Sequence, residues 1–246
     1  PSDLANAIPA LLLSQHLALD SIAFGTVLES AYGIGHEKFI EYKKGSHWRF
    51  YGKLFSCAGI EICLPVAGIS EVGTSLINYS SSYGEFAQSC IRGKWKKPCL
   101  KCWKCFRKEL LSISLDSNKK IDLKEIMKAS EVQIRLSAYP ISHENVIIYS
   151  IQNIDIKNFP ELKIIRNRLD MKIKLESLSR WYSPSLSLVP EKWKNIIRNK
   201  IIKYLKIMNE EDEELLHNWN MTPFLELDST KMAHSKLTSS WQDLSN

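Results

Sequence analysis

The sequence predicts an α/β fold in which a parallel-type sheet carries helices on its faces. Two observations predict this fold. A helix, a short apolar strand and a glycine-bounded loop follow one another twice within the first 90 residues, an alternation typical of α/β proteins. The 246 residues are 44% hydrophobic and 24% charged, so the chain can bury a core, and a disordered or low-complexity chain is excluded. This length suits one or two domains.

The first helix–strand pair begins with a helix expected over residues 4–19, where apolar residues recur at helical spacing. Ser2 or Asp3 can cap the N-terminus of this helix. The run SIAFG (residues 21–25) predicts a short buried strand that ends in glycine, and a loop with two more glycines follows it.

The second helix–strand pair consists of an amphipathic helix over residues 36–55 and the strand IEICLP, residues 60–65. A further helix is expected over residues 72–83, beginning near Ser70 and ended by Gly84. For this alternation a parallel-type sheet with helices on its faces is the economical architecture.

Beyond about residue 115 the pattern changes. Polar and apolar residues alternate in EVQIRLS (131–137), and VIIYSIQ (146–152) is almost entirely apolar. With polar residues between them, these two runs predict a β-hairpin.

The rest of the chain is predicted to be helical. Helices are expected over residues 161–181 and 191–208, and Pro190 stands just before the second, near a helix start where proline is tolerated. The acidic run EEDEE (210–214) suits the first turn of a helix that reaches Trp219. The last twenty residues are rich in Ser and Thr, and we expect them to be loosely ordered.

The positive charge of the chain is concentrated in one short segment. There are 33 Lys and Arg against 27 Asp and Glu, a formal net charge of +6. Residues 90–108 hold eight of the basic residues and no acidic one, which leaves 25 basic against 27 acidic residues elsewhere. The basicity is therefore local, and four of the six cysteines lie in the same segment.

The sequence also predicts where the protein works. No apolar run approaches the ~20 residues that a membrane-spanning helix needs, and the basic start of a signal peptide is missing. We therefore expect no membrane partner and a cytoplasmic protein with reduced thiols. Because the chain opens on Pro1 rather than Met, we expect it to be cut from a longer protein.

Four of the cysteines form a C-x8-C-x2-C-x2-C motif: Cys90, Cys99, Cys102 and Cys105. Structural zinc is held by four thiolates in a tetrahedron, with sulfur–zinc distances of about 2.3 Å. A two-residue spacer lets a tight turn aim two sulfurs at one point, and Gly93 and Pro98 can bend the longer spacer. Four protein ligands leave no position for a catalytic water, so the motif predicts a structural zinc site.

Two other interpretations of the four cysteines stay open, because an iron–sulfur cluster also uses four thiolates and thiols can be incidental. The surrounding basic residues, with Trp95, Trp103 and Phe106 as stacking partners, fit nucleic-acid contact. The same cations would also offset the −2 charge of a zinc ion with four thiolates. Cys57 and Cys63 stand apart, and we expect them to pack in or near the core.

Candidate cofactor-binding residues follow the first expected strand, where α/β sheets place ligand-binding loops. They are Gly25, Thr26 and Glu29, on the nucleotide or substrate side. Gly25 and Thr26 could let the backbone approach a nucleotide, whereas Glu29 could equally be a solvated loop acid.

Other polar residues fit structural positions. Glu71 suits a helix N-terminus, and His36 and His47 suit surface or capping positions, since no partner acid or nucleophile stands at a recognisable spacing. The sequence assigns no catalytic residue.

The segment SCIRGKWKKPCLKCWKCFRKELL (Ser89–Leu111) resembles the zinc-binding segment of the 7-cyano-7-deazaguanine synthase family, which acts in queuosine biosynthesis. The cysteine spacing, the serine before the first cysteine and the basic helix after the last are shared. Upstream, the resemblance rests on the order of elements, with an acid and a tyrosine in residues 29–32 and Pro65 after the second strand. It covers about residues 1–112.

The resemblance implies a nucleotide α-hydrolase-like parallel sheet with an ATP pyrophosphatase loop. Residues 1–115 would form the C-terminal part of that domain, with the zinc segment at 89–111, and residues 116–246 a mostly helical α+β extension. The implied function is an ATP-dependent carbon–nitrogen ligase, in which adenylation activates a carboxylate for attack by ammonia or an amine. ATP, Mg²⁺ and a deazapurine-type substrate would be its ligands, and we also expect a homodimer.

The sequence departs from the family in its phosphate loop and in its substrate loop. The phosphate loop S-G-G-x-D-S does not occur in these 246 residues, and Gly33-Ile34-Gly35-His36 replaces the substrate loop P-D-C-R. The altered loop and the extension fit a diverged relative of the antiphage-defence type that acts on a macromolecule. The alternative is a catalytically inactive, zinc-stabilised scaffold that binds nucleic acid or a partner protein.

Overall fold

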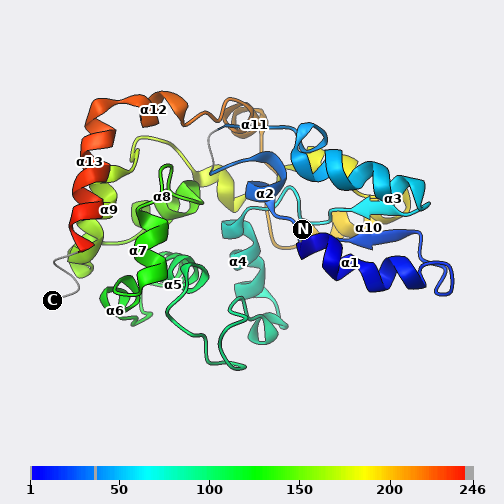
Figure 1. Cartoon of the computed structure of the whole chain (residues 1–246), viewed down its shortest axis with the longest axis horizontal. Helices are drawn as coiled ribbons and strands as arrows, with labels where there is room; N and C mark the ends of the chain where they lie inside the picture. Colours follow the sequence, from blue (N-terminus) through cyan, green and yellow to red (C-terminus); the bar gives the residue numbers. More distant parts are fainter. Residues whose placement is uncertain (1, 36–37, 242–246) are drawn as a thin grey trace. The chain divides into compact units, whose positions relative to one another are not determined.

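A computed structural model describes residues 2–35 and 38–241 of the chain (Figure 1). The fold is mixed α/β and mostly helical, which confirms the predicted class in its coarse form. The described residues form one two-stranded sheet, in which β1 (Ser21–Ala23) pairs in parallel with β2 (Glu61–Cys63). Both strands lie within the runs predicted to be strands. The larger sheet with helices on both faces is not found in this part of the chain.

The chain divides into two compact units, each made of separate stretches. Unit 1 comprises Pro1–Gly33, Phe39–Thr74 and Ser177–Asn218, and unit 2 comprises Ile34–Lys38, Ser75–Glu176 and Trp219–Asn246. Residues on both sides of the domain boundary predicted after residue 115 lie in unit 2.

Unit 1 packs helices around the two strands. Ala7, Phe55 and Ile60 form a buried cluster, against which Ile22 of β1 and Ile62 of β2 pack. Its helices and turns are α1 (Ser2–Leu13), α2 (Leu28–Tyr32), the 3-10 turn η1 (Tyr42–Lys44), the π-helical turn η2 (Trp48–Gly52), α3 (Lys53–Cys57), the 3-10 turn η7 (Ser183–Leu188), α10 (Glu191–Ile201) and α11 (Glu210–His217). Helix α4 (Glu71–Ser80) and the 3-10 turn η6 (Glu176–Ser179) have residues in both units.

Two of the helices predicted for unit 1 are wrong in their extent. Helix α1 ends at Leu13, not at residue 19; the chain continues in turns, and Ala18 adopts a left-handed conformation with φ at 49°. The continuous helix expected over residues 36–55 is a series of short turns, since glycines at positions 45 and 52 weaken a regular helix.

The helices near the end of unit 1 begin where they were predicted. Pro190 stands at the N-cap of α10, which ends at Ile201 instead of residue 208. Helix α11 begins at Glu210, and Asn209 and Asp212 form a capping box there. It ends at His217, two residues before the predicted end.

Unit 2 is arranged around α5, which packs against α6, α7 and α8, while α13 packs against α9 and α12 (Figure 1). Its helices and turns are the 3-10 turn η3 (Gly84–Phe86), α5 (Trp103–Leu115), α6 (Leu123–Met127), α7 (Ser130–Leu136), α8 (Glu144–Gln152), the 3-10 turns η4 (Ile156–Asn158) and η5 (Pro160–Leu162), α9 (Lys163–Arg168), α12 (Thr222–Glu226) and α13 (Asp228–Ser239).

The predicted hairpin over residues 131–152 is wrong, because both of its strands are helices, α7 and α8. Nearly every residue of α8 from Glu144 to Ile151 is buried. A helix that is buried on all sides carries apolar residues all round, so its sequence lacks helical periodicity. Such a run cannot be distinguished from a buried strand by its pattern.

Two further predictions in unit 2 are wrong. Helix α9 covers six residues of the expected 161–181 helix, and 3-10 turns flank it. The tail is not loosely ordered over residues 228–239, which form α13 with Leu237 buried. The Trp241 indole N–H donates to the Ser137 hydroxyl at 2.9 Å, a tertiary contact that Ser/Thr-rich composition does not indicate. Residues 242–246 lie outside the described part.

A buried polar cluster joins α8, α9 and α13. The Arg168 Nη1 atom lies 3.1 Å from Glu144 Oε1, and both side chains are fully buried. Arg168 Nε donates to His234 Nδ1 at 3.1 Å, while His234 Nε2 lies 3.1 Å from the Ser137 carbonyl oxygen. Because arginine only donates and a carbonyl only accepts, Nδ1 carries no proton and Nε2 carries one, so the ring is neutral.

Candidate metal centre

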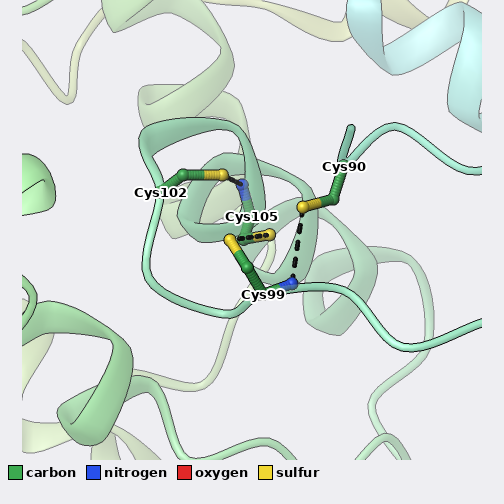
Figure 2. A group of neighbouring side chains, drawn as sticks. All are labelled: Cys90, Cys99, Cys102 and Cys105. Carbon is green, nitrogen blue, oxygen red and sulfur yellow. Dashed lines mark hydrogen bonds between the residues drawn. The ribbon is translucent and has the colours of Figure 1, made fainter. Parts of the chain in front are cut away.

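The structure brings the four predicted ligands together in unit 2. The sulfur atoms all lie within 4.8 Å of one another, and every one of these cysteines except Cys99 is buried (Figure 2). A tetrahedron with sulfur–zinc distances of about 2.3 Å has edges of about 3.8 Å. The sulfurs of Cys99 and Cys105 are 3.8 Å apart. The four cysteines can therefore hold a metal ion, and their spacing is compatible with zinc.

A tight turn returns the chain from Cys90 to the other ligands. Lys94 and Lys97 form an antiparallel bridge, with the Lys97 N–H donating to the Lys94 carbonyl at 2.9 Å. A Cβ atom on Gly93 would lie 2.3 Å from the Lys97 carbonyl oxygen, so only glycine fits at the base of this turn. This confirms Gly93 as a bend-forming residue.

The last ligands are placed by the start of α5. Leu100 adopts a left-handed conformation, with φ at 52°, and turns the chain between Cys99 and Cys102. Cys102 is the N-cap of α5, and its sulfur accepts from the Cys105 N–H at 3.5 Å. The C-x2-C spacing thus joins a helix cap to the first turn of the helix.

A backbone amide favours negative charge on one of these sulfurs, that of Cys90. The Cys90 sulfur accepts from the Cys99 N–H at 3.4 Å, and this hydrogen bond above all lowers the pKa of Cys90 to about 6. Burial raises the pKa of the Cys105 thiol. Of these two thiols, Cys90 is therefore the one that ionises more readily.

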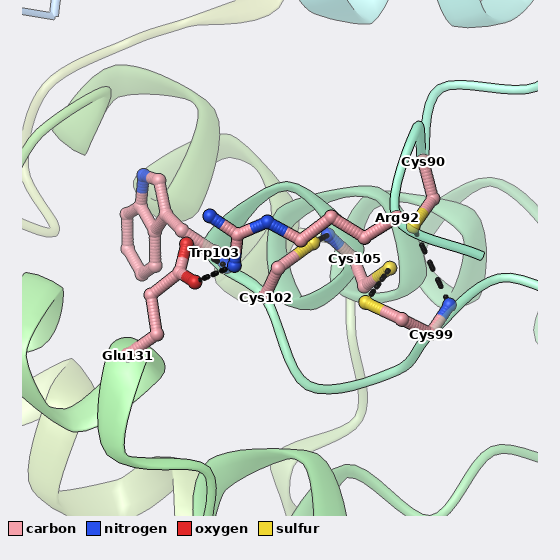
Figure 3. A network of polar contacts seen from close by, with 7 residues as sticks. All are labelled: Cys90, Arg92, Cys99, Cys102, Trp103, Cys105 and Glu131. Atoms are coloured by element: carbon pink, nitrogen blue, oxygen red, sulfur yellow. Dashed lines mark hydrogen bonds and ion pairs between the residues drawn. The ribbon is translucent and has the colours of Figure 1, made fainter.

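A second layer of side chains supports the centre from α7 (Figure 3). Glu131 accepts from the Trp103 N–H at 3.2 Å and forms an ion pair with Arg92. The Trp103 ring stacks on Phe106. The Arg107 guanidinium lies over the Trp103 ring, 5.8 Å from its centroid. No local motif links Glu131 to the cysteines, so sequence analysis missed it.

The basic side chains of the segment fall into two sets, one held within the structure and one exposed. Arg92 is paired with Glu131, and Arg107 is buried beside Trp103. These two arginines stabilise the segment itself, whereas Lys94, Lys97 and Lys101 are exposed.

Gly25 and Thr26 lie together at the carboxyl end of β1. With Phe24, Ser30 and His47 they line a cavity of about 310 Å³ in unit 1. A Cβ atom on Gly25 would meet no atom within 4 Å, so the backbone there borders open space.

Glu29, the third candidate cofactor-binding residue, is not among the residues that line the cavity with Gly25 and Thr26. Its side chain is fully buried, and its carboxylate oxygens accept from the Glu71 N–H at 3.0 and 3.1 Å. Helix α4 begins at Glu71, as expected. Glu29 is thus no solvated loop acid: its carboxylate lies at the N-terminus of α4, where negative charge is stabilised.

The remaining candidates have structural surroundings. The His47 Nδ1 atom is 2.7 Å from the Tyr42 hydroxyl oxygen, and its ring packs against Tyr51. His36 lies outside the described residues. Cys63 is buried, whereas Cys57 is exposed, which corrects the expectation that both pack in or near the core.

Two properties of the described residues bear on the predictions. The four cysteines are the one group of three or more His, Cys, Asp or Glu side chains there that could hold a metal ion. Over the same residues, no helix has both the length and the apolar composition needed to cross a bilayer.

Fold and site together define a mostly helical α/β protein with a four-cysteine centre that can hold a metal ion. The chain belongs to DUF6395, a family of unknown function, whose model matches residues 50–220. This match includes the cysteine segment and most of the chain beyond residue 115. No curated protein and no solved structure matches the chain significantly.

Proposed function

We propose that the chain is the zinc-bearing, substrate-side part of an ATP-dependent carbon–nitrogen ligase resembling the 7-cyano-7-deazaguanine synthases. The cavity at the carboxyl end of β1, lined by Gly25 and Thr26, carries this proposal. Ligands of α/β proteins bind where loops leave the carboxyl ends of parallel strands. The synthase-like cysteine spacing supports the same assignment.

The cavity has the size and chemistry for a small heterocycle such as a deazapurine. Its volume of about 310 Å³ lies at the lower end of the range for ligand sites. Thr26 and Ser30 offer hydroxyls for hydrogen bonds, and Phe24 and His47 offer rings, whose centroids are 5.9 Å apart. The open space beside Gly25 would let a ring edge approach the backbone.

The residues present do not fit the triphosphate of ATP or its Mg²⁺ ion. The S-G-G-x-D-S loop is missing from the sequence. Among the described residues, no three acidic side chains lie close enough together to bind a metal ion. We therefore assign substrate binding to this chain and derive no step of adenylation from it.

For the cysteine centre we infer one zinc ion with a structural role. In a cluster the four thiolates are divided between two or four irons, so sulfurs on different irons lie farther apart than sulfurs around a single ion. All four sulfurs lie within 4.8 Å of one another, which supports a single ion. With all four positions taken by protein, zinc would stabilise the fold rather than activate water.

Calorimetric titration with 7-carboxy-7-deazaguanine tests the ligase proposal. We expect the wild-type chain to bind, and Gly25→Leu, which fills the open space, to weaken binding by about tenfold or more. Thr238→Val is the control, because the Thr238 hydroxyl is exposed and bonds the Ser235 carbonyl of its own helix. Absence of wild-type binding, or equal binding by Gly25→Leu, would contradict the proposal.

A zinc-stabilised scaffold without catalysis, binding nucleic acid or a partner protein, is the second candidate. The cluster of eight basic residues in 90–108 favours it. Contacts to phosphates release counterions, so the affinity for nucleic acid should fall steeply as salt rises. An affinity that does not change with salt would count against phosphate contacts.

A further inference from the structure

A second cavity lies beside the cysteine centre, entirely within unit 2. It has a volume of about 490 Å³, in the range of sites that take ligands of nucleotide size. Its wall comes from α4, the chain before Cys90, the cysteine segment and α5. It shares no residue with the cavity of the ligase proposal, and a ligand bound here would rest on the second candidate function, a scaffold that binds nucleic acid.

The wall of this cavity carries more positive than negative charge. Four lysines and two glutamates line it: Lys96, Lys104, Lys108, Lys119, Glu85 and Glu109. Each glutamate lies close to one lysine, at 3.6 Å for Glu85 and Lys96 and at 3.5 Å for Glu109 and Lys119. Together the six side chains give the wall a net positive charge.

Those two lysines share one face of α5. Lys104 and Lys108 are four residues apart, so their side chains project to the same side of the helix. Lys108 Nζ lies 3.2 Å from the Ser75 hydroxyl of α4, which fixes the ammonium group at the wall. The zinc–thiolate group would carry −2, and against the eight basic residues of 90–108 the segment would still be strongly positive.

Two aromatic rings line the same cavity and are exposed. The exposed fraction is 56% for Trp95 and 66% for Tyr79. Exposed rings beside lysines are the combination with which proteins bind single-stranded nucleic acids, stacking bases on the rings and pairing phosphates with the cations. An acidic peptide would use the lysines but would have no need of the rings.

We propose that this cavity binds a nucleotide unit, with the base stacked on Trp95 and the phosphate held by Lys104 and Lys108. The unit could come from a free nucleotide or from a single strand of RNA or DNA, since both present a base and a phosphate.

Fluorescence anisotropy with a short labelled oligouridylate tests the proposal on the zinc-loaded full chain. Lys104→Glu should weaken binding by about tenfold or more, because it reverses a charge in the wall. Lys101→Glu is the matched control: Lys101 is exposed, also precedes a cysteine ligand, and does not line the cavity. It should weaken binding by less than about threefold.

The rings are tested separately. Trp95→Ala should weaken binding by about tenfold, whereas Trp95→Phe should largely restore it. Zinc content and melting temperature, measured for every variant, show whether the fold is intact. Competition by uridine monophosphate at similar concentration identifies a free nucleotide as the ligand, and oligonucleotide binding without such competition identifies a strand.

Three results would overturn the proposal. One is no binding of either probe at low salt. Another is an equal loss in the Lys104 and Lys101 variants, which would mean diffuse attraction to the basic segment. The third is binding of polyglutamate as tight as that of the oligonucleotide, which would leave the rings without a role.

Discussion

The carboxylate of Glu131 accepts a hydrogen bond from the backbone N–H of Trp103 at 3.2 Å, which connects α7 to the first residue of α5 (Figure 3). Cys102, the residue before Trp103, is both a candidate ligand and the cap of that helix. The side chain of Glu131, 28 residues away in the sequence, therefore restrains the backbone that carries the cysteine centre.

Removing this restraint should loosen the segment without removing its ligands. Glu131→Ala should cost about 1 kcal/mol of unfolding free energy, most of it from the lost bond at the helix start, since the exposed pair with Arg92 contributes little. Urea denaturation measures this cost. Arg92→Gln is the control and should have a smaller effect; an equal loss in both variants would mean that the ion pair dominates.

Metal binding can be separated from helix capping at Cys102. In Cys102→Ser the hydroxyl can still cap α5, but serine does not replace a thiolate on zinc. We expect native mass spectrometry to show one zinc per wild-type chain and loss of that ion in the variant, with faster proteolysis of residues 89–111. The exposed Cys57 provides the control, Cys57→Ser, which should keep its zinc. A metal-free wild-type protein of unchanged stability would refute the zinc site.

Glu29 should matter for stability even if it never touches a ligand. Glu29→Ala would leave the buried Glu71 N–H without this acceptor, and we expect a loss of about 1–3 kcal/mol in unfolding free energy. Glu29→Gln keeps an acceptor oxygen and should lose less. The exposed Glu41 provides a control, since Glu41→Ala should change stability by less than about 0.5 kcal/mol. Equal stabilities of Glu29→Ala and wild type would contradict the capping role.

Stability should fall in mild acid through His234. Burial lowers the pKa of this histidine below its ordinary value of about 6.5, so the unfolded chain binds the proton more tightly than the folded one. The contribution of the neutral ring is therefore full above about pH 6.5 and is lost as the pH falls toward the lower folded pKa.

A thermal scan against pH measures this effect. His234→Gln keeps hydrogen-bonding capacity without titrating, so its melting temperature should fall less between pH 7.5 and 5.5 than that of the wild type. Parallel curves for the two proteins would show that another group causes the acid sensitivity.

Local features of the fold and the centre could be predicted from sequence. Cys99, Cys102 and Cys105 lie within one turn and one helix start, so their spacing alone predicts that their sulfurs lie close together. The strands around Ile22 and Ile62 are short apolar runs bounded by turns, and they form where predicted.

The predictions that were wrong concern segments whose structure depends on contacts between residues far apart in the chain. The run Val146–Ile148 is buried on all sides by unit 2, and this burial removes the periodicity that identifies a helix. Arg168 bonds Glu144, 24 residues away in the sequence, and His234, 66 residues away. No local sequence pattern indicates either contact. Helix α13 is likewise fixed by partners such as Ser137, not by its composition.

The order in which the parts of this protein can fold follows from the division of unit 1 along the chain. The Leu64 N–H donates to the Leu188 carbonyl, and Trp181 bridges both Ile69 and Ile207, so the early residues of unit 1 close only with residues made much later. During synthesis the cysteine segment leaves the ribosome complete before those residues exist. Metal capture at the centre can therefore precede the closure of the part that carries β1 and β2.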